Sequence, residues 1–315
     1  MEGRIFKEGV PQHVYIRGKG GGIVFYCLED CIFYVTLYHC LARRYGIATT
    51  AFCIMPNHTH SQQRALSRRH FSAFNRDMVS VFTQGYNLQH KRRGQLFDKP
   101  FGSSPKSVGK TVKANISYIC NNGAEGRLSK GVLDYRWNLM AYCICKAPFS
   151  ESVALRHASR RLRRAMTLVR YFHDKGMHLD YKAQELVFKG LGQREKRQVT
   201  DFILSQYNVL DKSGIARYFG SIGKALAAME TNCGSEHDLK EDWDDYSVYR
   251  RLGKCVAETG LDLKTANFEM MDRQRLMLLK GYLKGCCTAS ERQIDKFLHI
   301  TKPGTAVTRQ SVRGR

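Results

Sequence analysis

The stretch "AFCIMPNHTH", Ala51 to His60, predicts the centre of the fold and a candidate site beside it. Its first five residues form an apolar run that suits a strand buried on both faces. After Pro56, His58 and His60 stand two positions apart, so in an extended strand both side chains point to one face and Thr59 to the other. Two imidazoles on one face suit a shared metal ion, although most isolated pairs with this spacing are ordinary surface histidines.

Hydrophobic periodicity around this stretch predicts further strands and helices. We expect a strand at "HVYIRG" (13–18) and helices over 28–45, 67–89 and 107–122, the last ended by Gly123. Strands in alternation with helices are consistent with an antiparallel sheet that is covered by helices on one side. The sequence therefore predicts an α+β fold.

After about Phe149 the pattern changes to helical periodicity without strand alternation. "RHASRRLRRAMTLVRYF" predicts a basic amphipathic helix, and "MMDRQRLMLLKGYL" and "SERQIDKFL" predict two more. "TKPGTAVTRQ" stands where the recognition helix of a helix-turn-helix would begin, and a helical bundle with a basic tail is the alternative. We expect two domains, residues 1–149 with the sheet and residues 150–315 as a basic helical domain.

Positive charge is the strongest global feature of the 315 residues. The formal net charge is +23 and the sequence pI is about 9.7. The excess is +13 in residues 1–150 and +10 in the remainder, so both halves carry it. A field of this sign attracts polyanions, and nucleic acid is the expected partner.

The cysteines and the hydropathy of the chain indicate the compartment in which the protein works. The eleven cysteines are scattered through a long chain without paired CxxC motifs, and its first residues lack the charged and apolar regions of a secretion signal. No apolar run approaches the ~20 residues that a membrane span requires. We therefore expect reduced thiols in a cytoplasmic protein that does not contact a membrane.

A second candidate group follows the first by about sixty residues. Tyr118 and Asn122 are four positions apart in the helix expected over 107–122, so both project from one face. Two histidines and an amide oxygen carry no charge, so a bound divalent ion would keep its charge for a phosphate ligand. Tyr118 could then attack phosphorus as a nucleophile, whereas on its own it could equally be a tyrosine of the core.

These segments resemble a known family. "MPNHTH" followed by "YICNN" is similar to the paired motifs of the single-tyrosine HUH transposases, in particular the REP-associated tyrosine transposases. "HVYIRGKGGGIVF", "RRGQLF" and "DYRWNLMAY" resemble further segments of that family, and together the five cover roughly residues 10–145 in the family's order.

The resemblance implies a fold, an activity and a set of site residues. The fold is a ferredoxin-like antiparallel sheet with the histidines on a central strand and the tyrosine on a helix beside it. His58 and His60 match the metal-binding histidines, Tyr118 the nucleophile, and Asn122 the residue that completes the metal site. The implied activity is metal-dependent cleavage and rejoining of single-stranded DNA near hairpins, through a 5′-phosphotyrosine and with Mg²⁺ or Mn²⁺.

Some residues depart from the family pattern. Thr59 replaces a bulky apolar residue but, as a β-branched residue, fits a strand. "SQQ" (61–63) stands where the family continues with apolar residues, which predicts that this strand ends early. No proline follows the asparagine of "YICNN". An inactivated or domesticated copy that only binds hairpin or single-stranded nucleic acid is therefore the alternative function.

Basic residues near the tyrosine helix are the candidates for DNA contacts, each with a solvated surface role as its alternative. They are Lys91, Arg92, Arg93, Lys106, Lys110, Lys113, Arg127 and Lys130. A zinc hydrolase is a third option, but no well-placed carboxylate supplies its third ligand or base. The sequence leaves open whether the chain forms a homodimer and whether Tyr118 works with the histidines of its own chain.

Overall fold

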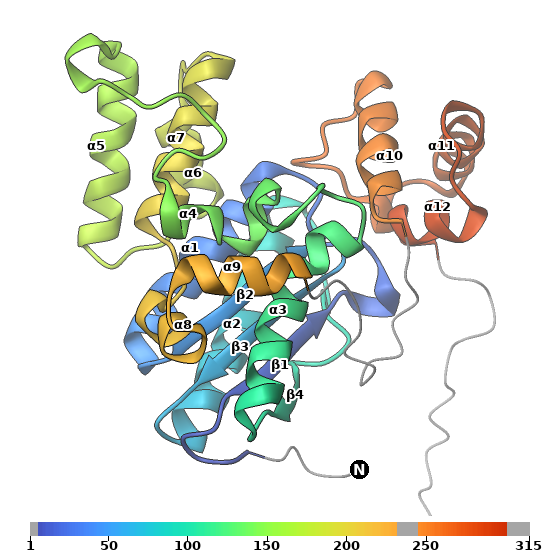
Figure 1. Cartoon of the computed structure of the whole chain (residues 1–315). Coiled ribbons are helices and arrows are strands. Elements are labelled where there is room, and N and C mark those ends of the chain that lie inside the picture. The colour runs from blue at the N-terminus through green and yellow to red at the C-terminus, as the bar shows by residue number, and fades with distance from the viewer. Residues whose placement is uncertain (1–5, 232–244, 301–315) are drawn as a thin grey trace, which may run out of the picture.

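The computed structural model describes residues 6–231 and 245–300 and has an α+β fold (Figure 1). A four-stranded antiparallel sheet has the strand order β2-β3-β1-β4. Its elements are β1 (Gln12–Arg17), α1 (Leu28–Tyr45), β2 (Ala48–Met55), β3 (His58–Arg64), α2 (Arg68–Gln89) and β4 (Gly102–Pro105). This succession and strand order are ferredoxin-like, so the predicted fold class is confirmed.

Helices cover both faces of the sheet, so the expectation of helices on one side alone is wrong. Different helices pack on the two faces, and this decides where the histidines point. Thr59 forms a hydrogen bond with Tyr34 of α1, its Oγ1 lying 3.0 Å from the tyrosine hydroxyl. Gln62 instead donates from Nε2 to Oδ1 of Asn115, at 2.8 Å, on α3 (Gly109–Glu125). Because strand side chains alternate, the two histidines lie on the face of Gln62, toward α3.

The strand that carries the histidines continues through "SQQ" (61–63), so the expected early end is wrong. All three residues are buried, and their polar groups have partners inside the protein. Oε1 of Gln62 accepts a hydrogen bond from Thr50 at 2.6 Å, and the amides of Gln63 and Asn75 bond to each other at 2.9 and 3.1 Å. Buried polar groups are tolerated where they are hydrogen-bonded, which lets a polar segment take a central position.

The predicted end of the tyrosine helix is also wrong. α3 runs past Gly123 to Glu125, with Gly126 as its C-cap. A Cβ at Gly123 would lie only 2.3 Å from ring atoms of Tyr135, so this glycine permits close packing rather than a left-handed turn. The short polar strand β4 was not predicted, because "GSSP" has no apolar alternation and pairs with β1 as an edge strand.

After β4 the described residues form helices joined by loops and add no further strand to the sheet, as the periodicity of the second half predicts. Figure 1 shows α5–α7 and α10–α12 as two groups on opposite sides of the sheet region, with α8 and α9 beside α3. The helices are α4 (Ala141–Ile144), α5 (Arg160–Asp174), α6 (Tyr181–Phe188), α7 (Gln193–Gln206), α8 (Lys212–Phe219), α9 (Ile222–Thr231), α10 (Ser247–Glu258), α11 (Arg273–Cys286) and α12 (Glu291–Phe297).

Three further expectations concern the recognition helix, the cysteines and membrane-spanning segments. The candidate recognition helix at 301–310 lies outside the described residues. The cysteines that the structure describes are free thiols, as expected. Within the same residues, no helix is both long and apolar enough to cross a membrane.

Candidate functional site

A turn between β2 and β3 positions the first histidine, and the glycine-rich segment after β1 supports that turn. The carbonyl of Pro56 accepts the backbone N–H of Val24 at 2.9 Å. Asn57 is held at two points, because its carbonyl accepts from the N–H of Gly18 at 2.7 Å and its Nδ2 donates to the carbonyl of Gly21 at 3.0 Å. The glycines thus allow the backbone to approach the turn closely.

The orientation of Asn57 determines the tautomer of His58. Since Nδ2 of Asn57 is the donor to Gly21, its Oδ1 faces His58, whose Nδ1 lies 2.6 Å away. An amide oxygen can only accept, so Nδ1 of His58 carries the proton and Nε2 carries the lone pair. Metal-binding histidines are usually oriented by such a hydrogen bond on the opposite ring nitrogen. Asn57 is therefore a positioning residue for a histidine that is ready to bind through Nε2.

A third histidine joins the pair. Nε2 of His13, on β1, lies 2.9 Å from Nδ1 of His60. The register explains the contact: Tyr15 is opposite His60, so His13 is its diagonal neighbour on the same face. The sequence predicted the strand that carries His13 but gave no sign of its role, because the contact depends on how β1 and β3 pair.

Tyr118 lies beside this histidine cluster. Its ring centre is 5.8 Å from that of His60 and 5.9 Å from that of His13, and the residue is 5% exposed. Asn122 follows one turn later on α3, and its Nδ2 donates to the carbonyl of Tyr118 at 2.9 Å. This bond leaves Oδ1 of Asn122 as the atom that would bind a ligand. The structure thus brings the predicted tyrosine and histidines together from separate segments.

The donor set limits what the site could hold. The rings of His58 and His60 have centres 4.7 Å apart and an interplanar angle of 86°, a separation at which both can reach one ion at bond lengths of about 2.0–2.1 Å. Among the described residues, no group of three or more His, Cys, Asp or Glu side chains is arranged to hold a metal. Two oriented imidazoles fit a divalent ion that takes its remaining ligands from oxygen atoms, including those of a bound phosphate.

A second tyrosine, which the sequence did not indicate, lies at the other end of the cluster. The ring centre of Tyr246 is 5.8 Å from that of His58, and its backbone N–H donates to the carbonyl of Gly126 at 3.2 Å. Tyr246 itself is 7% exposed, and His58 and His60 are 2% and 0% exposed. The cluster is therefore enclosed in this conformation.

The predicted DNA-contacting residues fall into two groups. Arg92 and Lys106 are largely covered; the side chain of Arg92 is 6% exposed and lies 2.7 Å from a carboxylate oxygen of Glu269. The others are exposed, although Arg127 lies 3.7 Å from Asp245. The exposed residues are Lys91, Arg93, Lys110, Lys113, Arg127 and Lys130.

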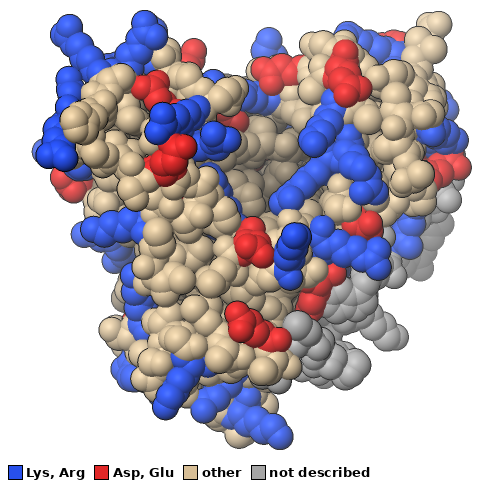
Figure 2. Space-filling view, turned by 45° about the horizontal axis from the view of Figure 1, so that its top comes forward, with Lys and Arg blue, Asp and Glu red and all other residues tan. Residues whose placement is uncertain are grey.

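Further basic side chains gather on the helical groups. Figure 2 shows lysine and arginine over both groups and a hollow between them. The arginines of α5 contribute five exposed positions, with Leu162, Ala165 and Val169 buried on the opposite side of the helix. The exposed arginines are Arg160, Arg161, Arg163, Arg164 and Arg170. The amphipathic basic helix predicted from the sequence is confirmed.

Comparisons with known proteins found a solved structure that is similar to this chain. No protein-family model and no curated protein matches it. The chain is similar to a REP-associated tyrosine transposase whose structure was solved with a REP hairpin bound, with 14% sequence identity and a TM-score of 0.38. The match covers 44% of this chain and 80% of the other.

Proposed function

We propose that this chain is a metal-dependent DNA transposase that cleaves and rejoins single-stranded DNA near hairpins through a 5′-phosphotyrosine. The observation that carries the proposal is the cluster itself: a tyrosine ring 5.8 Å from a histidine whose neighbour is held in the metal-binding tautomer. The net charge of +23 supports a nucleic-acid substrate.

In the proposed reaction, Tyr118 is the nucleophile. Its Oη forms a bond to phosphorus while the bond from phosphorus to the 3′-oxygen breaks, so one phosphodiester replaces another and a free 3′-hydroxyl is released. Water or another neighbouring base takes the proton of the phenol, because both ring nitrogens of His60 are engaged, Nδ1 by His13 and Nε2 by the proposed metal. A later attack by a 3′-hydroxyl on the phosphotyrosine rejoins the strand and restores Tyr118.

The metal site of the proposal consists of His58 and His60 through Nε2 and Asn122 through Oδ1. A bound Mg²⁺ or Mn²⁺ would supply Lewis-acid polarisation of the scissile phosphate. Asn57 and His13 keep the two imidazoles in position through their hydrogen bonds to Nδ1. Among the described residues, no carboxylate joins the two histidines in a metal-binding group, so the charge of the ion would be directed to the phosphate.

A denaturing gel tests this function. The full chain is incubated with labelled hairpin oligonucleotides that carry single-stranded extensions, with Mn²⁺, with Mg²⁺ or with EDTA. We expect a covalent protein–DNA adduct with either metal and a loss of at least about a hundredfold in EDTA, since the metal supplies several kcal/mol of transition-state stabilisation. An adduct of equal yield in EDTA would exclude the metal-dependent mechanism.

His13 gives a second prediction within the same assay. His13→Ala removes the partner that fixes His60, and losses of such supporting hydrogen bonds typically cost about 10–100-fold in metal affinity or activity. We expect the initial rate of adduct formation to fall by this factor when it is measured well below the melting temperature, which should itself fall because the side chain of His13 is buried. His70→Ala, an exposed position on α2, is the matched control. An unaltered rate in His13→Ala would mean that His60 needs no support from β1.

The enclosure of the cluster favours one alternative, a non-catalytic binder of hairpin or single-stranded nucleic acid. A binder needs the basic surface but not an accessible Tyr118, which is 5% exposed. The two functions differ in metal occupancy: the binder would show salt-sensitive DNA affinity without a bound metal and without an adduct. Metal analysis of the purified protein beside the gel assay separates them.

A further inference from the structure

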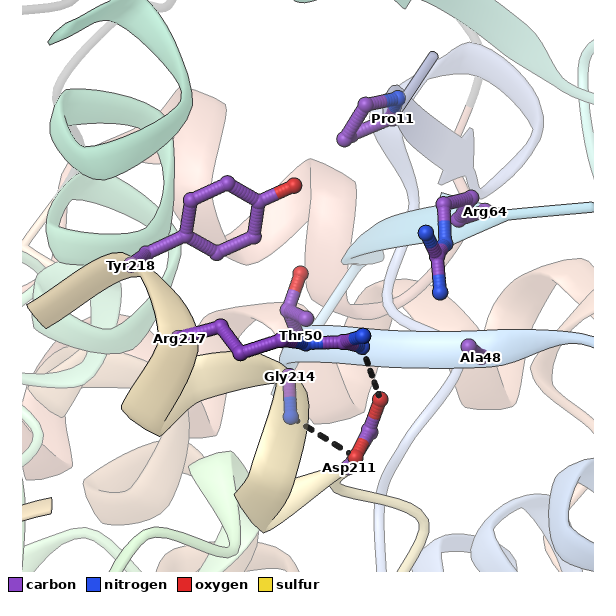
Figure 3. Close-up of a pocket in the computed structure, with 8 residues that line it drawn as sticks. All are labelled: Pro11, Ala48, Thr50, Arg64, Asp211, Gly214, Arg217 and Tyr218. Carbon is purple, nitrogen blue, oxygen red and sulfur yellow. Dashed lines mark hydrogen bonds and ion pairs between the residues drawn. The ribbon is translucent and has the colours of Figure 1, made fainter. Parts of the chain in front are cut away.

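A cavity of about 210 Å³ opens where β2 begins and β3 ends (Figure 3). Sites for whole cofactors and drug-sized ligands usually enclose about 300–1,000 Å³, so this one suits a smaller group. The strand ends form one wall and α8 forms another. The lining residues are Pro11, Ala48, Thr50, Arg64, Asp211, Gly214, Arg217 and Tyr218.

Hydrogen-bond donors dominate the lining. Figure 3 shows the guanidinium of Arg64 and the hydroxyl of Tyr218 directed into the cavity. In residues 6–231 and 245–300, neither side chain makes a hydrogen bond or an ion pair. Arg217 is engaged only loosely, with its Nη2 at 3.7 Å from Oδ2 of Asp211. Two guanidinium groups and a phenol against one carboxylate favour an anion with several oxygen acceptors, and phosphate is the anion that arginine binds best in this way.

The carboxylate has a structural role of its own, which keeps α8 beside the sheet. Oδ1 of Asp211 accepts from the N–H of Gly214 at 2.8 Å and caps α8. The N–H of Asp211 donates to the carbonyl of Thr49 on β2 at 2.7 Å. The position of Asp211 is therefore explained by its structural hydrogen bonds, whereas no such bond explains the positions of the Arg64 and Tyr218 side chains.

Buried hydrogen bonds connect the cavity to the tyrosine helix. Thr50, in the cavity wall, donates from Oγ1 to Gln62 at 2.6 Å, and Gln62 donates to Asn115 of α3 at 2.8 Å. Asn115 lies one turn before Tyr118 on α3. The cavity and the candidate active site are thus linked through hydrogen bonds between β2, β3 and α3.

An exposed lysine lies between the two sites. Arg64 is four residues beyond His60 on the same face of β3, about 13 Å along a strand that rises ~3.3 Å per residue. On α3, the exposed Lys113 places its Nζ 5.8 Å from the ring centre of Phe219 on α8. A DNA strand that leaves Tyr118 along this side of α3 would therefore pass Lys113 and reach the cavity.

We propose that the cavity formed by Arg64, Arg217 and Tyr218 binds a backbone phosphate of the single-stranded DNA that extends from the hairpin. The inference rests on the proposed function for the identity of the strand. It goes beyond that function by assigning α8, a helix outside the ferredoxin-like unit, to substrate binding. Because only a phosphate is bound, the site contributes register and affinity without reading a base.

Equilibrium binding in EDTA, where the proposed chemistry is suppressed, tests this site. Fluorescence anisotropy is measured for a hairpin with single-stranded extensions and for the same hairpin with blunt ends. For Arg64→Ala and Arg217→Ala we expect about tenfold weaker binding of the extended hairpin only, and Tyr218→Phe should act in the same direction. The slope of log K against log salt should become shallower by about 0.7 for a lost single-strand phosphate contact. Arg43→Ala, an exposed arginine on α1 across the sheet, is the matched control.

Several outcomes would overturn the site. Equal losses for the extended and blunt hairpins would show that these side chains contact the stem, and unchanged affinity would show that they contact no DNA. Thermal shifts with inorganic phosphate form a separate arm. If phosphate stabilises the wild type but not Arg64→Ala, while DNA binding is unaffected, the cavity is a free-anion site and the DNA assignment is wrong.

The phosphate site in the cavity and the proposed cleavage by Tyr118 can fail independently, and the experiments distinguish the two failures. Loss of the covalent adduct with retained, Arg64-dependent binding of the extension would contradict the transposase but support the cavity. If the adduct forms normally but Arg64→Ala leaves the affinity for the extended hairpin unchanged, the transposase is supported and the cavity site is contradicted.

Discussion

Tyr118→Phe is expected to abolish the covalent protein–DNA adduct, with a loss of at least about a thousandfold, the scale seen when a catalytic nucleophile is removed. The substitution deletes a single oxygen. The buried ring keeps its packing against His60 and His13, so the fold and DNA binding should persist. The readouts are adduct yield on a denaturing gel and, in parallel, anisotropy of the same hairpin in EDTA.

Tyr246→Phe is the matched control, because the ring of Tyr246 lies as close to His58 as that of Tyr118 does to His60. We expect this variant to retain the adduct. The reverse result, with the adduct lost in Tyr246→Phe and kept in Tyr118→Phe, would transfer the nucleophile to a residue 128 positions away. Loss of hairpin affinity in Tyr118→Phe would indicate instead that the phenol serves binding.

Asp30→Asn is expected to destabilise the whole fold by about 3–5 kcal/mol, the usual result of breaking a buried charged network. Asp30 is fully buried near the start of α1. Oδ2 accepts the backbone N–H groups of Tyr26 and Cys27 at 2.9 and 3.1 Å, and Oδ1 accepts from the hydroxyl of Tyr181 at 2.7 Å. One carboxylate thereby joins α1 to α6 and to the loop before α1.

An amide at this position has the same size but offers donors where the protein already supplies donors. Burial and the adjacent Asp30 carboxylate raise the pKa of Tyr181, so its hydroxyl remains a donor across the working pH range. Domains of this kind are stable by only about 5–15 kcal/mol, so the loss should be plain in urea-induced unfolding. Glu185→Gln, an exposed carboxylate on α6, should change stability by less than about 0.5 kcal/mol. Similar midpoints for the two variants would show that Asp30 does not hold these elements together.

Local pattern was enough to predict those parts of the site that depend on a single segment. The side-chain alternation of a strand placed His58 and His60 on one face, and the helical repeat placed Tyr118 and Asn122 one turn apart. Both are properties of backbone geometry over a few residues. The same local reasoning failed at "SQQ" (61–63), where polarity suggested a strand end but partners from other elements satisfy the side chains.

The sequence by itself determined the α+β class, the helical second half, the positive charge and the residue pairs whose spacing is local. Only the tertiary structure decided that His13 bonds to His60, that Tyr246 closes the cluster, and that Arg217 and Tyr218 meet Arg64 in one cavity. Each of these contacts joins segments far apart in the chain. Their position depends on strand register and on the burial of many side chains together, and neither is encoded in the spacing of nearby residues.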